Sequence, residues 1–224
     1  MKKQSGFTLI ELAIVLVIIG LLLGGVLKGQ ELINSAKVKN MATDFRNIPV
    51  YIYGYQDKYK ALPGDDAAAK NHLGVTADQS ALASNGVING KWDSATAGDE
   101  SVLFWQHVRL AGLAPGETVV NVAAGNTYFP RNADGGLIGV TNGSVADLPI
   151  ATLHGTYVIC SSGILGKFAK QLDVNLDDGN TATGSVQVMA EPAAHPAPVG
   201  VAAIPTTGVG GIDDATTYTV CQAF

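Results

Sequence analysis

Four oxygen-bearing side chains gather within eight positions in the C-terminal third of the chain. They are Asp173, Asp177, Asp178 and the amide of Asn180, and Gly179 offers a tight turn among them. Hard carboxylate and amide oxygens in a bent loop are ligands that Ca²⁺ accepts in proteins. However, their spacing differs from that of an EF-hand loop. The sequence therefore favours a solvated acidic turn after a helix, with calcium as the alternative and no other cofactor or metal expected.

A single carboxylate, Glu11, interrupts the apolar run from Phe7 to Leu27. An unpaired charge in hydrocarbon costs from about 3 to more than 10 kcal/mol, so an acidic residue in such a segment marks a functional position. A cationic partner in the same low-dielectric surroundings would offset much of that cost. The alternative is a glutamate that reaches to the edge of a membrane and has no other role.

The two cysteines, Cys160 and Cys221, lie 61 positions apart and form no CxxC pair. That spacing disfavours a zinc site or thioredoxin-like chemistry. A structural disulfide is the better expectation, because the apolar N-terminal run points to a location outside the cytoplasm, where such bonds persist. Two buried free thiols are the alternative.

The sequence offers no catalytic signature, and we expect no catalytic residues. No GxSxG elbow, Walker loop, HxxxH pair or HExxH pair occurs in it. The net charge is −5, and 14 Lys and Arg residues are spread through the chain, so no basic patch is available to bind phosphate backbones. Nucleic acid is therefore not an expected partner. Surface or core-packing roles are expected for all four histidines, which are His72, His107, His154 and His195.

The apolar run is long enough to cross a membrane. As a helix, Phe7 to Leu27 rises about 31 Å, which matches a hydrocarbon core of about 30 Å. Lys2 and Lys3 precede the run, so the positive-inside rule leaves the N-terminus in the cytoplasm. No convincing A-x-A cleavage site follows Leu27, so we expect the run to be retained. Two pairs of glycines have the GxxxG spacing that permits close helix packing in lipid: Gly20 with Gly24, and Gly25 with Gly29.

Helical spacing continues beyond the apolar run. Apolar residues at intervals of three and four predict a one-sided stripe on a helix. Pro49 should bend this helix, and the Ala-Leu-Pro-Gly stretch at 61–64 should end it. We therefore expect one long helix, with residues 7–27 in the membrane and an amphipathic extension over 28–62. The stripe consists of Val38, Met41, Phe45, Ile48, Ile52, Tyr55 and Tyr59.

The N-terminus closely resembles that of type IV prepilins and type II secretion pseudopilins. A basic leader ends in Gly6, Phe7 follows it, and Glu11 stands at the fifth position after that glycine. The resemblance implies that a membrane prepilin peptidase cleaves between Gly6 and Phe7, removing residues 1–6 as a leader peptide, and methylates the new amine of Phe7. Shorter stretches that are also similar to a subgroup of these proteins lie at 61–66, 100–113 and 176–180.

The resemblance implies a structural subunit of a type IV pilus or type II secretion pseudopilus, and not an enzyme. Its partners would be copies of itself or related pilins in a helical filament, the prepilin peptidase, an inner-membrane assembly platform and, before assembly, the lipid bilayer. In the filament, Glu11 of one subunit would meet the Phe7 amine of a neighbour and set the axial register, as buried polar residues do in coiled coils.

The implied location is the bacterial inner membrane, crossed once, with the C-terminal domain in the periplasm, followed by a periplasmic or extracellular filament. The alternative is a single-pass, membrane-anchored periplasmic binding protein or enzyme that does not polymerise. Gly6 and Glu11 argue against this alternative, because a simple anchor needs neither residue.

Residues 63–224 are expected to form a periplasmic globular α+β domain. The fold class is then pilin-like, with one long N-terminal helix packed on a small antiparallel sheet. A short helix should begin after Asp99 as N-cap and stop at Gly112, and a second should span Ile164–Leu172. A disulfide would tie the last strand to the sheet and enclose the Ala/Pro-rich stretch 190–205, expected on the outside. The strands are predicted at Thr127–Phe129, Leu137–Val140, Thr156–Cys160, Ser185–Met189 and Thr217–Cys221.

Overall fold

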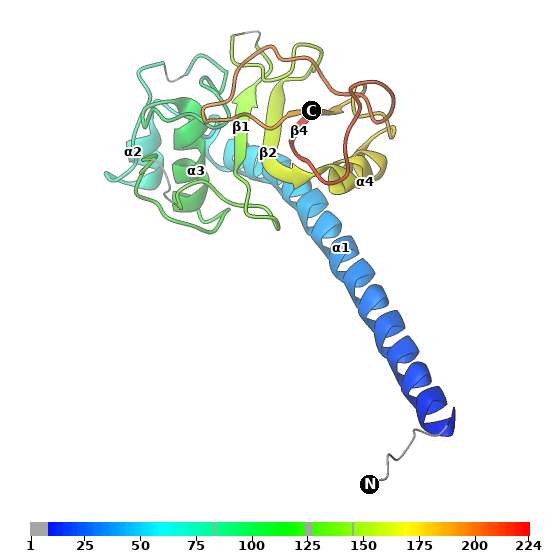
Figure 1. Ribbon diagram of the computed structural model, residues 1–224. Helices are drawn as coiled ribbons and strands as arrows, with labels where there is room; N and C mark the ends of the chain where they lie inside the picture. Colours follow the sequence, from blue (N-terminus) through cyan, green and yellow to red (C-terminus); the bar gives the residue numbers. More distant parts are fainter. Residues whose placement is uncertain (1–8, 83, 124–126, 145) are drawn as a thin grey trace. The chain divides into compact units, whose positions relative to one another are not determined.

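The structure is a computed structural model that describes residues 9–82, 84–123, 127–144 and 146–224 (Figure 1). Its elements follow the order α1, α2, α3, β1, β2, α4, β3 and β4. The chain divides into two compact units, Met1–Lys39 and Asn40–Phe224. The predicted α+β class is confirmed, since the second unit combines helices with a four-stranded antiparallel sheet.

Helix α1 extends over Leu9–Tyr59, 51 residues, which confirms the predicted long helix. Pro49 lies inside it without ending it. The helix ends three residues before the predicted boundary, because Lys60 takes a left-handed backbone conformation with φ of 56°. In the second unit the predicted stripe is buried from Met41 to Tyr55, and Tyr59 is half-buried.

The sheet contains four antiparallel strands in the order β1-β2-β4-β3. Strand β2 pairs with β4, which places Cys160 directly opposite Cys221. Four predicted strands are therefore confirmed, each with boundaries shifted by a few residues. Their bounds are Ile138–Asn142 for β1, Tyr157–Leu165 for β2, Val186–Ala190 for β3 and Thr217–Ala223 for β4.

The fifth predicted strand, Thr127–Phe129, is wrong. Tyr128 and Phe129 are buried, as their composition indicated, but they belong to a loop. The backbone carbonyl of Tyr128 accepts a hydrogen bond from the guanidinium of Arg109, and its hydroxyl donates to the carbonyl of Val102. A side chain therefore satisfies this backbone group in place of a neighbouring strand.

Three further helices belong to the second unit: α2 over Ala69–Leu73, α3 over Glu100–Leu110 and α4 over Gly166–Leu176. The predicted N-cap of α3 is correct in position and wrong in its bonding. Asp99 makes no capping hydrogen bond, because its carboxylate accepts one from the Ser94 hydroxyl at 2.5 Å. Helix α4 starts later than predicted because β2 continues to Leu165.

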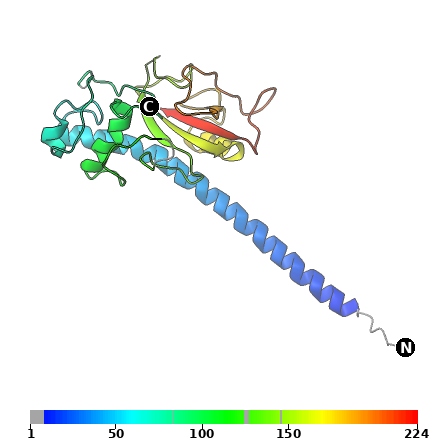
Figure 2. The same ribbon diagram turned by 60° about the vertical axis from the view of Figure 1, so that its left-hand side comes forward.

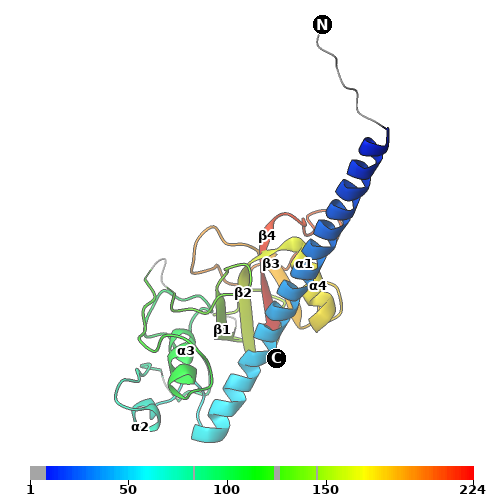
Figure 3. The same ribbon diagram turned by 90° about the horizontal axis from the view of Figure 1, so that it is seen from below.

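Within the second unit, the part of α1 that follows residue 40 lies across one face of the sheet (Figure 3). The side chain of Gln56 approaches Tyr157 of β2 there and opposes in part the rise that burial causes in the pKa of Tyr157. Helix α3 lies beside the end of α1, where the rings of Tyr55 and His107 stack with centroids 6.1 Å apart (Figure 2). These contacts anchor the end of the long helix in the globular unit.

A second hydrophobic core lies on the opposite face of the sheet. Because side chains alternate along a strand, Val158 and Cys160 point away from the face that carries Tyr157. They pack with Trp92 and Ala197, among others. The stretch 190–205 carries no helix or further strand after β3, and it is mostly exposed as expected, but its Ala197 is only 2% exposed and helps to close this core.

Candidate functional site

The first part of α1 exposes apolar side chains along its whole surface. Every residue from Leu9 to Leu27 is exposed, and the most apolar window of the helix has a mean hydropathy of 2.8 with none of it buried. By length and composition this helix could cross a membrane. A Cβ atom added at any glycine of the two GxxxG pairs would meet no heavy atom within 4 Å, so no contact within the described chain requires Gly20, Gly24, Gly25 or Gly29.

Glu11 lies in the first turn of α1, with an exposed side chain. An acidic group at this end of a helix is favoured by the partial positive charge of the helix N-terminus. The predicted cleavage and methylation positions, Gly6 and Phe7, lie outside the described residues. The structure therefore gives the position of Glu11, while its pairing with the Phe7 amine stays a prediction.

A hydrogen-bonded cluster holds the end of α1 to the following loop. The Tyr55 hydroxyl donates to Asp66 Oδ2 at 2.7 Å, and His72 Nδ1 lies 2.6 Å from the same oxygen. Burial raises the pKa of Asp66, but hydrogen bonds from His72, Tyr55 and the Ala68 N–H outweigh it, and the net shift of the pKa is downward. Asp66 is thus a charged structural residue at neutral pH.

Helix α3 carries two buried basic side chains that organise the loops around it. His107 Nδ1 accepts a hydrogen bond from the Gly64 N–H at 2.9 Å, so its proton is on Nε2, which lies 2.8 Å from the carbonyl oxygen of Asp78. Arg109 donates to the carbonyls of Pro115, Glu117 and Tyr128 at 3.2, 2.9 and 2.7 Å. Both residues serve the core, which for His107 confirms the predicted packing role.

The remaining histidines occupy different settings. His154 is exposed, and His72 belongs to the cluster at the end of α1. His195 Nδ1 lies 2.5 Å from Asp93 Oδ2, a carboxylate whose side chain is fully buried. These positions agree with the predicted surface and packing roles.

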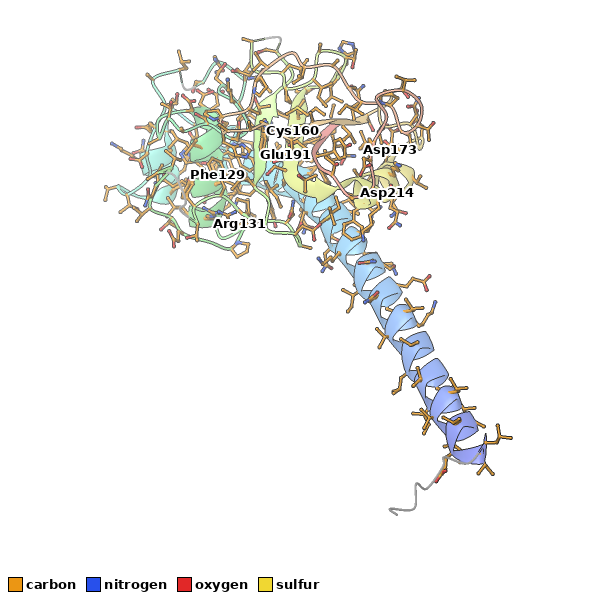
Figure 4. All side chains as sticks on the ribbon, in the orientation of Figure 1. Phe129, Arg131, Cys160, Asp173, Glu191 and Asp214 are labelled. Atoms are coloured by element: carbon orange, nitrogen blue, oxygen red, sulfur yellow. A yellow bond between two sulfur atoms is a disulfide. The ribbon has the colours of Figure 1, made fainter. Side chains whose placement is uncertain are left out.

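The structure brings together three of the four candidate calcium ligands. Ligand oxygens of Asp173, Asp177 and Asp178 all lie within 4.8 Å of one another at the end of α4 (Figure 4). The fourth candidate, Asn180, uses its amide oxygen to accept a hydrogen bond from the Ala182 N–H at 3.3 Å. Asp173 is 0% exposed, which the sequence pattern did not predict.

A cavity of about 620 Å³ lies between loops that are distant in the sequence. Its walls include Phe129, Arg131 and Glu191, labelled in Figure 4, together with His195. Glu191 is fixed by hydrogen bonds from the Gly163 N–H at 2.9 Å and from the hydroxyl of Thr219 at 2.8 Å. No local spacing in the sequence links the segments that line this cavity, so the sequence alone does not predict it.

The N-terminal residues 1–27 match the family model described as the prokaryotic N-terminal methylation motif. No curated protein matches the chain. The matched residues include Gly6, Phe7 and Glu11, the same positions on which the sequence resemblance depends. They also include the apolar part of α1 whose side chains are exposed in the structure. The chain therefore carries at its N-terminus the signature of the type IV pilins and pseudopilins.

Proposed function

We propose that this protein is a structural subunit of a type IV pilus or type II secretion pseudopilus that assembles through its N-terminal helix. One observation carries the proposal: the methylation motif at 1–27 coincides with a helix whose residues from Leu9 to Leu27 are all exposed. So large an apolar surface is unfavourable in water and needs a cover. Lipid supplies that cover before assembly, and the helices of neighbouring subunits supply it afterwards.

Processing prepares the helix for this change of surroundings. Prepilin peptidase cuts between Gly6 and Phe7 on the cytoplasmic side of the bacterial inner membrane, and methylation of the Phe7 amine follows. The new amine is positive and stands four residues before Glu11. In the filament the Glu11 carboxylate meets the Phe7 amine of a neighbouring subunit, and their pairing fixes the axial register because either charge alone would be costly away from water.

The rest of the chain gives the filament its surface. The unit Asn40–Phe224 is periplasmic before assembly, and an inner-membrane assembly platform adds the subunit to copies of itself or related pilins. The motif supports the processing step directly, while the architecture of an exposed helix joined to an α+β unit supports assembly.

Mass spectrometry of the mature N-terminus tests the processing step. We expect a chain that begins with methylated Phe7, and Gly6→Val should leave an uncut precursor in the membrane because a branched side chain would obstruct the peptidase. A mature protein that retains Met1 would reject this step, and with it the proposal, in favour of a simple membrane anchor.

A pair of glutamate variants tests the assembly step. Glu11→Val should be cut and inserted normally but should reach sheared filaments at least about tenfold less than the unchanged chain, since a register pair worth about 1.4 kcal/mol changes an equilibrium tenfold. Glu31→Val is the matched control, because Glu31 is an exposed glutamate of α1 beyond the apolar run, paired with Lys28 at 2.7 Å. Equal filament yields from both variants would remove the role proposed for Glu11.

A further inference from the structure

The cavity of about 620 Å³ beside Glu191 lies within the unit Asn40–Phe224, apart from the helix surface that the proposed assembly uses. Its volume falls in the range of about 300–1,000 Å³ that is usual for small-molecule sites in proteins. The carboxylates of Asp93, Asp134 and Glu191 line it, together with the guanidinium of Arg131 and the imidazole of His195. The walls are therefore net negative whether or not His195 is protonated.

Asp93 is a buried carboxylate whose charge is compensated only in part. Its side chain is fully buried, and Oδ2 accepts a hydrogen bond from the Ala197 N–H at 2.7 Å and one from His195 Nδ1 at 2.5 Å. The other oxygen, Oδ1, has no hydrogen-bond partner among the described residues. Because a buried charge with an incomplete set of partners is costly, a cation in the adjoining cavity would stabilise Asp93.

The same contact turns His195 into a fixed acceptor. Its Nδ1–H is donated to Asp93, and the Trp92 ring meets the imidazole edge-on, with centroids 5.7 Å apart. The neutral imidazole then carries its lone pair on Nε2, and no described residue makes a hydrogen bond there. The side chain is 33% exposed where it lines the cavity, so Nε2 is available to a ligand that donates a hydrogen bond.

Glu191 supplies a second fixed anion. Its Oε2 accepts both hydrogen bonds that hold the side chain, from the Gly163 N–H at 2.9 Å and the Thr219 hydroxyl at 2.8 Å. These are its polar contacts within the described chain, so Oε1 is left for a ligand. Neither hydrogen bond brings a positive charge to the carboxylate.

Arg131 does not neutralise Glu191. Its backbone pairs with Leu137, and the Leu137 N–H donates to the Ser162 hydroxyl of β2 at 2.9 Å. Two strand spacings, about 10 Å, therefore separate the backbone of Arg131 from that of Ser162, next to which Glu191 is anchored. The Arg131 guanidinium donates to the Gly135 carbonyl at 2.8 Å and forms no ion pair with Glu191 (Figure 4).

The spacing of these groups suits an organic cation better than a metal ion. A metal ion needs several ligand atoms around one point. Among the described residues, three acidic or histidine side chains with ligand atoms within 4.8 Å of one another occur at the end of α4 and not in this cavity. Phe129 and Leu137 add apolar surface to the walls, and an aromatic ring also attracts an organic cation.

We propose that this cavity binds a primary alkylammonium group together with its aliphatic stem. The ammonium donates hydrogen bonds to Glu191 Oε1 and His195 Nε2, and its positive charge compensates Asp93 behind the imidazole. The stem packs against Phe129 and Leu137. Free diamines and polyamines carry this group, and so do the lysine side chains of other proteins.

Calorimetric titration of the full-length protein in nonionic detergent micelles tests the proposal. The probes are 1,5-diaminopentane and Nα-acetyl-lysine methylamide, and we expect one of either to bind per chain. The Nε-acetylated form of the lysine compound should bind at least about tenfold more weakly, because acetylation removes the charge. Tighter binding of the diamine would identify a free polyamine as the natural ligand, and tighter binding of the lysine compound a protein side chain.

Two results of this titration would overturn the proposal: no binding of either amine at up to about 10 mM, or equal binding of the acetylated compound. Neither result bears on the proposed assembly, because the cavity belongs to the globular unit. Cleavage before Phe7 and the filament yield of Glu11→Val are measured separately.

Three substitutions locate the site. Glu191→Gln keeps an acceptor for Gly163 and Thr219 but removes the charge, so it should weaken amine binding at least about tenfold. Glu117→Gln is the matched control, an exposed glutamate of the same unit outside the cavity, and should leave the affinity unchanged. Arg131→Gln removes a positive charge from the cavity wall and should strengthen amine binding severalfold.

The opposite signs keep the test decisive, because damage to the fold would weaken binding in every variant. Unchanged affinity in Glu191→Gln, or weaker binding in Arg131→Gln, would contradict the assignment. If Glu191→Gln does not fold, the exposed position 131 still decides, since its substitution leaves the buried partners of Asp93 in place.

Discussion

Arg109 is the side chain on which the loops around α3 most depend. It is only 7% exposed, and its guanidinium donates to the carbonyls of Pro115, Glu117 and Tyr128. Its carbon Cζ also lies 4.9 Å from the centre of the Tyr128 ring. A planar group with several donors can satisfy three acceptors at once, which a lysine ammonium cannot do in the same geometry.

Arg109→Lys should therefore lower the free energy of unfolding by about 2 kcal/mol, because one ammonium cannot reach the buried carbonyl of Tyr128 and also the part-buried carbonyls of Pro115 and Glu117. Urea denaturation followed by circular dichroism measures this loss. Arg131→Lys is the matched control, since Arg131 is exposed, and its effect should stay within about 0.5 kcal/mol. The interpretation fails if the two variants are equally stable.

His107 makes the stability of the protein depend on pH. Burial lowers its pKa, opposed in part by the carbonyl of Asp78 and the charges of Asp66 and Asp78. The unfolded chain therefore binds a proton before the folded chain does when the pH falls. The contribution of neutral His107 is present above its unfolded pKa of about 6.5 and is lost as the pH falls toward the lower folded value.

We expect the stability advantage of the unchanged chain over His107→Gln to shrink between pH 7 and pH 5. Asp173 acts in the opposite direction, since its raised pKa of about 6 gives a contribution present at low pH and lost as the pH rises through that value. Comparing two chains that differ only at position 107 cancels this effect. Denaturation curves at both pH values give the difference, and a constant or growing advantage would show that His107 is not the titrating group.

At the scale of elements, the sequence predicted the parts whose spacing repeats. The stripe from Met41 to Tyr55 has a helical period and is buried along α1, and β1 to β4 follow runs bounded by turn residues. The sequence at Tyr128 predicts a strand where the structure has a loop, because β-forming residues are also suited to burial beside a side-chain donor such as Arg109. Five-residue α2 lies below the length at which periodicity is informative.

The candidate sites also differ in whether a local pattern in the sequence predicts them. The acidic loop could be located from the sequence because its carboxylates lie within a few positions of one another, but the complete burial of Asp173 could not. Burial depends on how α4 packs against the sheet, which no local pattern encodes. The cavity beside Glu191 joins segments more than 50 residues apart, so only the folded chain reveals it.

The disulfide between Cys160 and Cys221 joins the two central strands, β2 and β4, and confirms the predicted link to the last strand. Replacing both cysteines with alanine should lower the free energy of unfolding by up to about 4 kcal/mol, from the chain entropy of the 61-residue separation. Urea denaturation of the double variant measures the loss. A matched double change of Ser161 and Ser185 to alanine keeps the bond, and an equal loss there would show that the disulfide adds nothing of its own.

At the scale of the whole molecule, a substitution at a glycine of α1 can test assembly without affecting folding. Because a Cβ at Gly24 would contact nothing within 4 Å, Gly24→Leu should leave the melting temperature of the globular unit unchanged. If the GxxxG spacing marks a helix-packing face in the proposed filament, the same change should reduce the filament yield severalfold. Val26→Leu, at another exposed position of the same helix, is the control. Equal yields from both variants would leave the glycines without a packing role.

The placement of β4 also limits the order in which the protein can become folded. Strand β4 lies between β2 and β3, yet its residues follow both in the chain. Until residues 217–223 have left the ribosome, β2 and β3 each keep an unpaired edge and Cys160 lacks its sulfur partner. Exposed edges of this kind are where chains aggregate or where chaperones bind. A slow supply of the last strand would therefore be a point at which the newly made chain depends on quality control.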